Sequence, residues 1–165
     1  KAGISRASFY LYFEDKEDLL GCIAESWVDV ILRKLTEAFR VSDGSYYESM
    51  KLWMSQALEN DISREVWKVY KRVMEEEDFT RKSKMGALQF KASPKWRQVI
   101  EECYGHMDQS RYPGLTPEKL AYAVDMGLLA MVQLSMRYVE HYAPLAELKE
   151  AAWHQLTILD KGIRE

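Results

Sequence analysis

The sequence predicts an all-α protein, and three observations support this prediction. Apolar residues recur at intervals of three or four through most of the chain, which is the spacing of one face of an α-helix. No segment alternates apolar and polar residues for long enough to indicate a β-strand. Cap and turn residues, chiefly Ser, Thr, Asp, Gly and Pro, divide the periodic segments into helices. With 165 residues, of which 47% are hydrophobic, the chain can bury one sizeable core.

The first twenty residues predict a tight turn followed by a short helix. Gly3–Ser5 is the turn, and the hydroxyl of Ser5 is placed to cap a helix from Arg6 to about Tyr12. Phe9 and Phe13 lie four residues apart on one face of this helix. Its other face carries polar side chains: Arg6, Ser8, Tyr10 and Tyr12. A turn followed by a short helix that is polar on its outer side is typical of the second half of a DNA-reading helix-turn-helix.

A long helix is predicted next, from Asp15 to about Arg40. Asp15 is its N-cap, and the acidic Glu17 and Asp18 lie in the first turn, where the helix dipole favours negative charge. Its apolar positions are spaced by three or four residues: Leu20, Ile23, Trp27, Ile31, Leu35 and Ala38. A helix of about 26 residues is roughly 39 Å long, enough to connect a DNA-binding head to a distant body. The turn residues 41–45 end it.

Three further helices are expected in the middle of the chain. The first spans Tyr46 to Asn60, and the second has Ser63 as its cap and reaches about Glu77. The stretch from Asp78 to Ser93 has no clear period. Ser93-Pro94 indicates the start of the third helix, which ends before Pro113-Gly114.

The last two helices are apolar on more than one face. One opens at Thr116-Pro117-Glu118 and runs to about His141, and the other follows Ala143-Pro144. We expect one apolar face of these helices to contact the protomer's own core and the other face to contact a second copy of the chain. The alternative is that both faces belong to one intramolecular core. Gly127 costs about 1 kcal/mol against Ala in a helix interior, which close approach of a partner backbone would offset. The predicted dimer interface is Gly127, Met131, Leu134, Leu148, Ala152, Leu156 and Leu159.

The start of the chain carries a family resemblance. The run from Ala2 to Leu20, A-G-I-S-R-A-S-F-Y-L-Y-F-E-D-K-E-D-L-L, resembles the recognition segment of TetR-type transcriptional regulators. The close match covers only this segment, and the rest of the chain resembles the family as a string of helices. The resemblance implies an incomplete helix-turn-helix unit over residues 1–20, with the recognition helix at about 6–12. It also implies a helical effector-binding and dimerisation domain over residues 21–165.

The same resemblance assigns residues to DNA contact. Family members carry a first helix and most of a second before this point, so the chain as given should by itself bind DNA poorly. The resemblance implies base contacts from Arg6 and Ser8, with Arg6 able to pair with guanine. The full predicted DNA-binding set is Ser5, Arg6, Ser8, Tyr10, Tyr12 and Lys16, where the last three correspond to positions that contact phosphate or base. The alternatives are solvated surface positions and, for Tyr12, packing inside the three-helix unit.

A ligand pocket is expected among the middle helices. Tryptophan, tyrosine and methionine are abundant there, and their side chains give adaptable contact area for an apolar or planar molecule. Taken alone, such stripes are more often plain core, and it is the family resemblance that favours a pocket. The residues chosen to line it are Trp53, Tyr70, Met74, Tyr104, Met107 and Met126.

Other chemistry finds no support in the sequence. The three histidines and two cysteines show no metal-ligand spacing, and Cys22 and Cys103 indicate buried thiols in a reduced, cytoplasmic protein. No catalytic motif or phosphate loop is present. The net charge of −3 does not by itself indicate nucleic acid. Since no apolar stretch approaches the length of a membrane span, we expect no membrane partner, and we expect no metal or cofactor.

The family resemblance implies a ligand-responsive transcriptional regulator, and the absence of a catalytic motif leads us to expect that it is not an enzyme. On the same resemblance we expect a repressor that binds a palindromic operator in double-stranded DNA as a homodimer and is released by a small apolar or aromatic effector. Two alternatives stay open. One is an all-helical ligand-binding or protein-interaction module that does not bind DNA. The other is a cofactor-free helical enzyme, for which the sequence offers no polar constellation.

Overall fold

The fold is all-α, as predicted. The computed structural model describes residues 8, 10–59, 93–140 and 144–165, and in these ranges it contains helices and no strand. The helices of this part of the chain are α2 (Lys16–Val41), α3 (Tyr46–Glu59), α7 (Pro94–Gly105), α8 (Pro117–Val139) and α9 (Leu145–Arg164).

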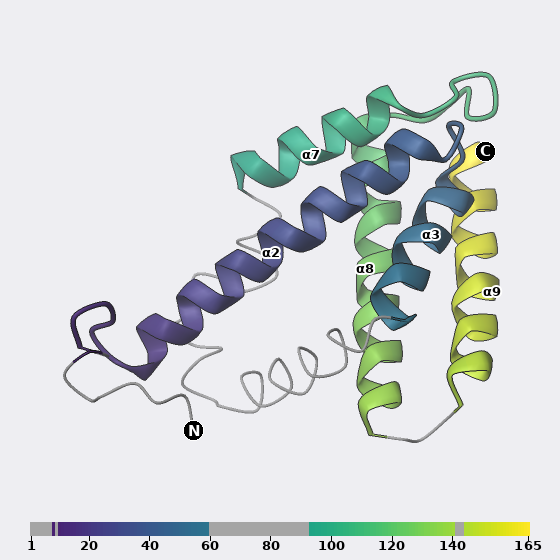
Figure 1. Ribbon diagram of the computed structural model, residues 1–165. Coiled ribbons are helices and arrows are strands. Elements are labelled where there is room, and N and C mark those ends of the chain that lie inside the picture. The colour runs from purple at the N-terminus through teal and green to yellow at the C-terminus, as the bar shows by residue number, and fades with distance from the viewer. Residues whose placement is uncertain (1–7, 9, 60–92, 141–143) are drawn as a thin grey trace.

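The helices form a bundle from which α2 projects. Figure 1 shows α8 and α9 side by side and running in opposite directions, with α3 next to α9. α3 contacts α2, α8 and α9, whereas α7 contacts α2 and α8. The N-terminal half of α2 begins away from the other labelled helices (Figure 1), and burial among its described residues starts at Leu32. The C-terminal half of α2 is therefore the part that joins the core.

Local signals set the start of α2. Asp15 is its N-cap, as predicted, and the Asp15 carboxylate accepts a hydrogen bond from the Asp18 amide at 2.8 Å. The Asp18 carboxylate accepts in turn from the Glu14 amide at 3.0 Å. Two backbone donors at this helix end are thus satisfied by neighbouring side chains. α2 is 26 residues long, which agrees with the predicted long helix.

The turn from α2 to α3 depends on a glycine. Asp43 and Gly44 have φ values of 50° and 70°, in the left-handed region that favours glycine. The Gly44 carbonyl accepts from the Asp108 amide at 3.1 Å, and a Cβ on Gly44 would lie 2.6 Å from that amide nitrogen. This close approach joins the turn to the loop that follows α7. Ser45 then caps α3 by accepting from the Glu48 amide at 3.3 Å.

Two further helix starts follow the predicted caps. The Ser93 hydroxyl accepts from the Trp96 amide at 3.1 Å, and Pro94 occupies the first position of α7. The Thr116 hydroxyl accepts from the Lys119 amide at 3.3 Å at the start of α8. These short-range contacts explain why the starts of both helices could be read from the sequence.

The predicted helix ends hold to within one or two residues for α3 and α8. The short helix predicted over 6–12 is described only in part: Ser8 is helical and 10–12 form a turn, so the helix stops earlier than predicted. The predicted helix 63–77 and the stretch 78–92 lie outside the described residues.

The core lies where α3 and the C-terminal half of α2 meet α7, α8 and α9. Phe39 of α2 and Tyr46 of α3 are almost fully buried, with their ring centroids 6.4 Å apart in an edge-on arrangement. A Cβ on Gly127 of α8 would lie 2.4 Å from Cε of Met50 on α3. The absent side chain of Gly127 therefore lets α8 approach α3 of the same protomer. This corrects the prediction that Gly127 accommodates the backbone of a partner.

A buried polar network connects α3, α8, α9 and the loop before α8. The Tyr46 hydroxyl donates to the Ala123 carbonyl at 2.7 Å, and the Tyr46 amide donates to the Tyr112 hydroxyl at 3.0 Å. Tyr112 donates from that hydroxyl to Asp160 Oδ1 at 2.5 Å. Arg164 Nε donates to Asp160 Oδ2 at 2.8 Å, and its guanidinium lies 5.0 Å from the centre of the Tyr112 ring. The buried Asp160 carboxylate thereby gains the partners it needs.

The two cysteines differ in environment. Cys103 of α7 is fully buried, as predicted, whereas Cys22 of α2 is exposed, so the prediction of two buried thiols is wrong for Cys22. Burial raises the pKa of the Cys103 thiol from 9.0 to about 12. The neutral thiol is therefore the form that the folded state favours.

We expect alkaline pH to destabilise the protein. The Cys103 contribution is complete below the unfolded thiol pKa of 9.0 and is lost as the pH rises towards about 12. Burial also raises the pKa values of Tyr46 and Tyr112, which act in the same direction. Thermal unfolding between about pH 8 and about pH 11 should show a falling midpoint, and Cys103→Ala should make that fall less steep. A midpoint that stays constant over this range in the unaltered chain would contradict the expectation.

Candidate functional site

The first candidate site is the segment that precedes α2. Tyr10 and Tyr12 are 61% and 78% exposed, and Leu11 between them is 79% exposed. Phe13 and Ser8 are partly buried, and partial burial of Phe13 agrees with its predicted packing role. The exposure of Leu11 was not predicted from the sequence. Its spacing from the neighbouring apolar residues does not distinguish an exposed position from a packed one.

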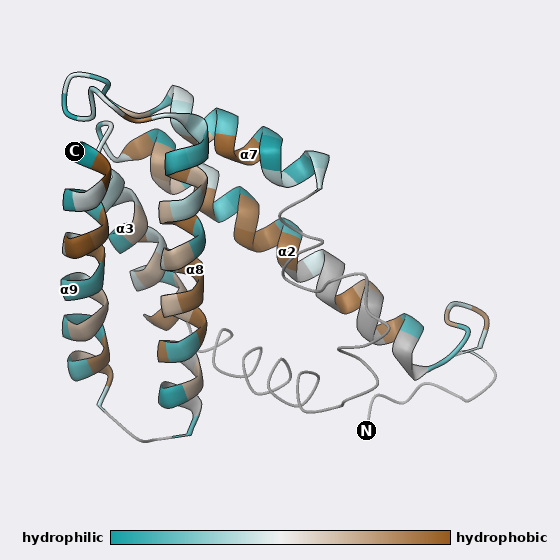
Figure 2. Cartoon of the chain, turned by 180° about the vertical axis from the view of Figure 1, so that it is seen from behind, coloured by the Kyte–Doolittle hydropathy of each residue, from teal (hydrophilic) through white to brown (hydrophobic). Residues whose placement is uncertain are grey.

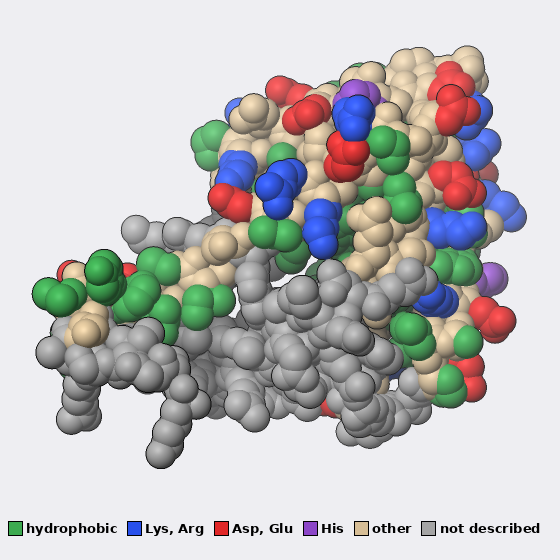
Figure 3. All heavy atoms as spheres, in the orientation of Figure 1, with side chains coloured by type: hydrophobic (Ala, Val, Ile, Leu, Met, Phe, Trp, Pro, Cys, Tyr) green, Lys and Arg blue, Asp and Glu red, His purple; other side chains and the backbone are tan. Residues whose placement is uncertain are grey.

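Three of the predicted DNA-contact side chains lie outside the described residues: Ser5, Arg6 and the side chain of Lys16. Among the described residues, hydrophobic side chains gather at the free end of α2 (Figure 3). The described charges beside Tyr10 and Tyr12 are acidic and exposed: Glu14, Asp15 and Asp18. The described part of this segment can therefore supply phenol hydroxyls and aromatic surface, but it supplies no positive charge.

The four described residues predicted to line a ligand pocket differ in their burial. Trp53 and Met107 are core residues, 4% and 6% exposed. Tyr104 is partly buried, and its hydroxyl donates to a backbone carbonyl of the loop before α8 at 3.2 Å. Met126 is 51% exposed on α8, so its assignment to an interior pocket is corrected. Tyr70 and Met74 lie outside the described residues.

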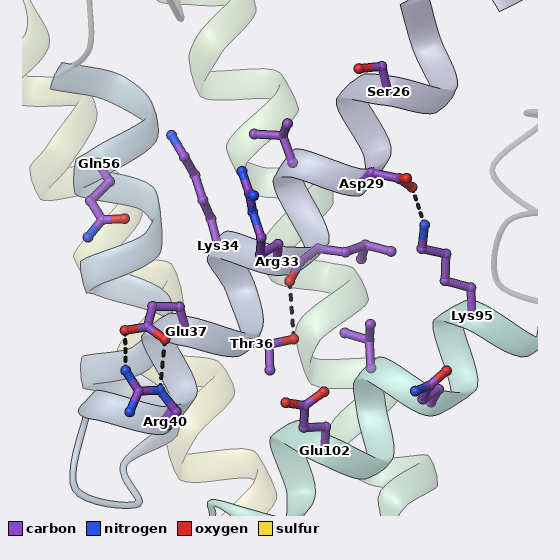
Figure 4. A pocket seen from close by; sticks show the side chains of 14 residues that line it. Ser26, Asp29, Arg33, Lys34, Thr36, Glu37, Arg40, Gln56, Lys95 and Glu102 are labelled. Atoms are coloured by element: carbon purple, nitrogen blue, oxygen red, sulfur yellow. Dashed lines mark hydrogen bonds and ion pairs between the residues drawn. The ribbon is translucent and has the colours of Figure 1, made fainter. Parts of the chain in front are cut away.

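A groove of about 1010 Å³ lies elsewhere, along α2. Figure 4 shows its lining: α2 crosses the middle, Gln56 of α3 lies to one side, and residues 95–102 of α7 lie to the other. None of the residues predicted to bind ligand lines this groove. Lys and Arg side chains gather with a few acidic ones over the area between α2 and α7 (Figure 3). The groove is thus bordered by charge and not by aromatic rings.

Two ion pairs lie inside the groove. Lys95 at the start of α7 pairs with Asp29 in the middle of α2. Arg40 binds Glu37 through two hydrogen bonds, with Nε 2.8 Å from Oε2 and Nη2 2.6 Å from Oε1. The hydrogen bonds from Arg40 lower the pKa of the Glu37 carboxyl, which keeps it ionised. These pairs leave Arg33 and Lys34 as the groove cations for which the described contacts include no acidic partner.

A third candidate site is the outer surface of α8 and α9. Tyr122, Met126 and Leu129 are 75%, 51% and 46% exposed, and their spacing of four and three residues places them on one side of α8. Ile158 of α9 is 57% exposed. Viewed from behind, α8 carries hydrophobic positions along most of its length (Figure 2). We call Tyr122, Met126, Leu129 and Ile158 the outer apolar face.

The structure corrects the predicted dimer interface. Five of its residues are at most 4% exposed and belong to the core of a single protomer: Met131, Leu134, Leu148, Ala152 and Leu156. Leu159 is partly buried against the same core. Both α8 and α9 have exposed apolar residues, but the residues predicted for the interface lie on the stripe that faces the protomer's own core. Periodicity in the sequence does not show which of two apolar stripes the protomer covers.

The described part of the chain offers neither a metal site nor a membrane span. No group of three or more His, Cys, Asp and Glu side chains there is arranged to hold a metal ion. None of the described helices combines the length and apolar character needed to span a bilayer. Comparisons with protein-family models, with curated proteins and with solved structures find no significant match.

Proposed function

We propose that the protein is a ligand-responsive, DNA-binding transcriptional regulator of the TetR type. It acts in the cytoplasm as a homodimeric repressor, without catalysis, and leaves its operator when a small effector binds. The observation that carries the proposal is the exposed Tyr10–Tyr12 segment that precedes α2, within the run that resembles a TetR recognition segment. The N-terminal half of α2 then separates this head from the bundle, which the C-terminal half of α2 joins.

The head offers groups suited to a DNA backbone. A phenol hydroxyl can donate to a phosphate oxygen while its ring packs on sugar, which positions a protein without reading sequence. Tyr10 and Tyr12 are exposed enough to do this. In the proposal, Arg6 and Ser8 read base edges in the major groove, and Lys16 contacts phosphate.

The outer apolar face supports a homodimer. Exposed apolar clusters on a protein surface mark interaction sites, and a two-fold axis lets one such face meet its own copy. Tyr122, Met126 and Leu129 form a continuous row on α8, and α9 packs against α8 along its length. A symmetric pair of α8–α9 hairpins would bury this row in a four-helix contact.

Effector control would act through α2. Two recognition helices must lie about 34–36 Å apart to enter successive major grooves. An effector can bind more tightly to a state of the dimer in which the recognition helices have a different separation. It then lowers the affinity for the operator, and the size of this effect is set by the difference between the effector's affinities for the two states. α2 is the element that connects the head to α3 and α7, so a change in its orientation reaches the head directly.

We expect Tyr10→Ala and Tyr12→Ala each to weaken operator binding by the full-length protein by about tenfold. Each variant removes a phosphate donor and aromatic surface, a loss of about 1–2 kcal/mol. Because the contact is to the backbone, the loss should be similar on specific and unrelated DNA. Fluorescence anisotropy with a labelled operator measures it, and Val41→Ala, at an exposed apolar position remote from the head, is the control. Unchanged affinity in both tyrosine variants would remove the proposed role of the head.

A second candidate function is a helical interaction module that does not bind DNA. The acidic Glu14, Asp15 and Asp18 beside the exposed tyrosines favour it, since carboxylates repel a phosphate backbone. In that case the unaltered full-length protein shows no affinity for any duplex at low salt, where electrostatic repulsion and attraction are both strongest.

A further inference from the structure

The groove along α2 has an uneven distribution of charge. Its acidic residues Asp29 and Glu37 are already paired with Lys95 and Arg40. Arg33 and Lys34 both line the groove, and no ion pair engages either within the described chain. Two adjacent cations in a concave surface attract an anion more strongly than they would on a convex one.

These two cations lie next to each other on α2, between the two ion pairs of the groove (Figure 4). Figure 4 shows Arg33 and Lys34 extending from α2 in the same direction, with the Gln56 amide of α3 on the Lys34 side. Glu102, the remaining groove carboxylate, lies on α7, across the groove from Lys34 (Figure 4). A guanidinium, an ammonium and an amide thus line the same groove, and all three can donate hydrogen bonds.

Apolar side chains lie beside these cations in the groove. Val30 lies one turn of α2 before Arg33 and is 37% exposed, and Val99 of α7 also lines the groove. A ligand with a charged head and an apolar body could therefore place its head on the cations and its body along Val30 towards α7. The lining of the groove is mainly polar and charged, with Val30, Leu32 and Val99 as its apolar part.

We propose that this groove binds a small anionic amphiphile whose carboxylate or phosphate group is held by Arg33, Lys34 and Gln56. Arg33 can hold either head group with two parallel hydrogen bonds, and Lys34 adds a point charge. Making this ligand the effector rests on the proposed function, but its binding does not. The groove is a site separate from the head, since Lys16 and Arg33 lie roughly 26 Å apart along α2.

The test uses the full-length protein without DNA and isothermal titration calorimetry. Octanoate and octyl phosphate are the probes, and octanol has a similar body without the charge. We expect at least one anion to bind about tenfold or more tightly than octanol. The anion that binds more tightly identifies the head group.

The variant Arg33→Gln/Lys34→Gln should weaken binding of that anion by about tenfold or more. The matched control is Arg97→Gln/Lys119→Gln, which removes the same charge from exposed positions outside the groove and should bind as the unaltered chain does. Circular dichroism checks that both variants fold. Equal binding of octanol and the anions, or equal loss in both double variants, would overturn the proposal. Since no DNA is present, failure of operator binding leaves this result unaffected.

Discussion

Replacing Asp160 with alanine should lower the free energy of unfolding by about 3 kcal/mol. The Asp160 carboxylate is the point at which Tyr112 and Arg164 meet, with contacts of 2.5 and 2.8 Å. Its loss leaves the Tyr112 hydroxyl, buried beside Tyr46, without an acceptor. Because the network connects α9 to the start of α3, the substitution should loosen the packing of the C-terminal helix. Urea denaturation followed by circular dichroism measures the change.

Two further variants show whether the network is the cause. Asp29→Ala removes a carboxylate that also forms an ion pair, but its side chain is 60% exposed, so we expect a loss below about 1 kcal/mol. Tyr112→Phe should destabilise the protein, and combining it with Asp160→Ala should cost less than the sum of the two. Strict additivity, or equal effects of Asp29→Ala and Asp160→Ala, would show that the buried contact is not what stabilises this region.

The double variant Met126→Glu/Leu129→Glu should convert the proposed dimer into a monomer. Both residues belong to the outer apolar face and are about half exposed in the protomer, so the monomer should fold normally. In a symmetric contact the variant places four carboxylates between two protomers, and their desolvation and mutual repulsion should weaken dimerisation by about 100-fold or more. Sedimentation equilibrium measures the change in mass.

Operator binding provides a second measurement for the same variant. A monomer engages one half-site at a time, so affinity for a palindromic operator should fall together with dimerisation. Val41→Glu is the control, because Val41 is 52% exposed and lies at the end of α2, away from the outer apolar face. A double variant that keeps the mass of the unaltered protein would place the contact elsewhere.

Much of the secondary structure could be predicted because its signals are local. The caps Asp15, Ser93 and Thr116 bond to backbone amides three residues ahead, so each can be recognised in a few letters of sequence. The turn at Gly44 was expected from its composition, and its positive φ accounts for the glycine. The early end of the first short helix was not predicted, since turn and helix share the same residue types there.

The candidate sites were harder to predict because they depend on which faces meet. α8 carries two apolar stripes, and the protomer covers the one with Met131 and Leu134 and exposes the one with Met126 and Leu129. Asp160 occupies a core position of α9 only because Tyr112 and Arg164 bind its carboxylate; Tyr112 is remote in sequence, and Arg164 lies one turn further along α9. The acidic residue that interrupts the apolar stripe of α9 was the one sequence signal that could have indicated this buried carboxylate.

The amino-acid order alone determined that the chain is helical, where its described helices begin, and that a long helix follows a segment resembling a DNA-reading element. These properties follow from periodicity and capping, which act over a few residues. Only the tertiary structure decided which apolar stripe is core, which carboxylate is buried, and where a charged groove forms between α2 and α7. Each of these depends on contacts between segments far apart in the chain, which a local pattern does not encode.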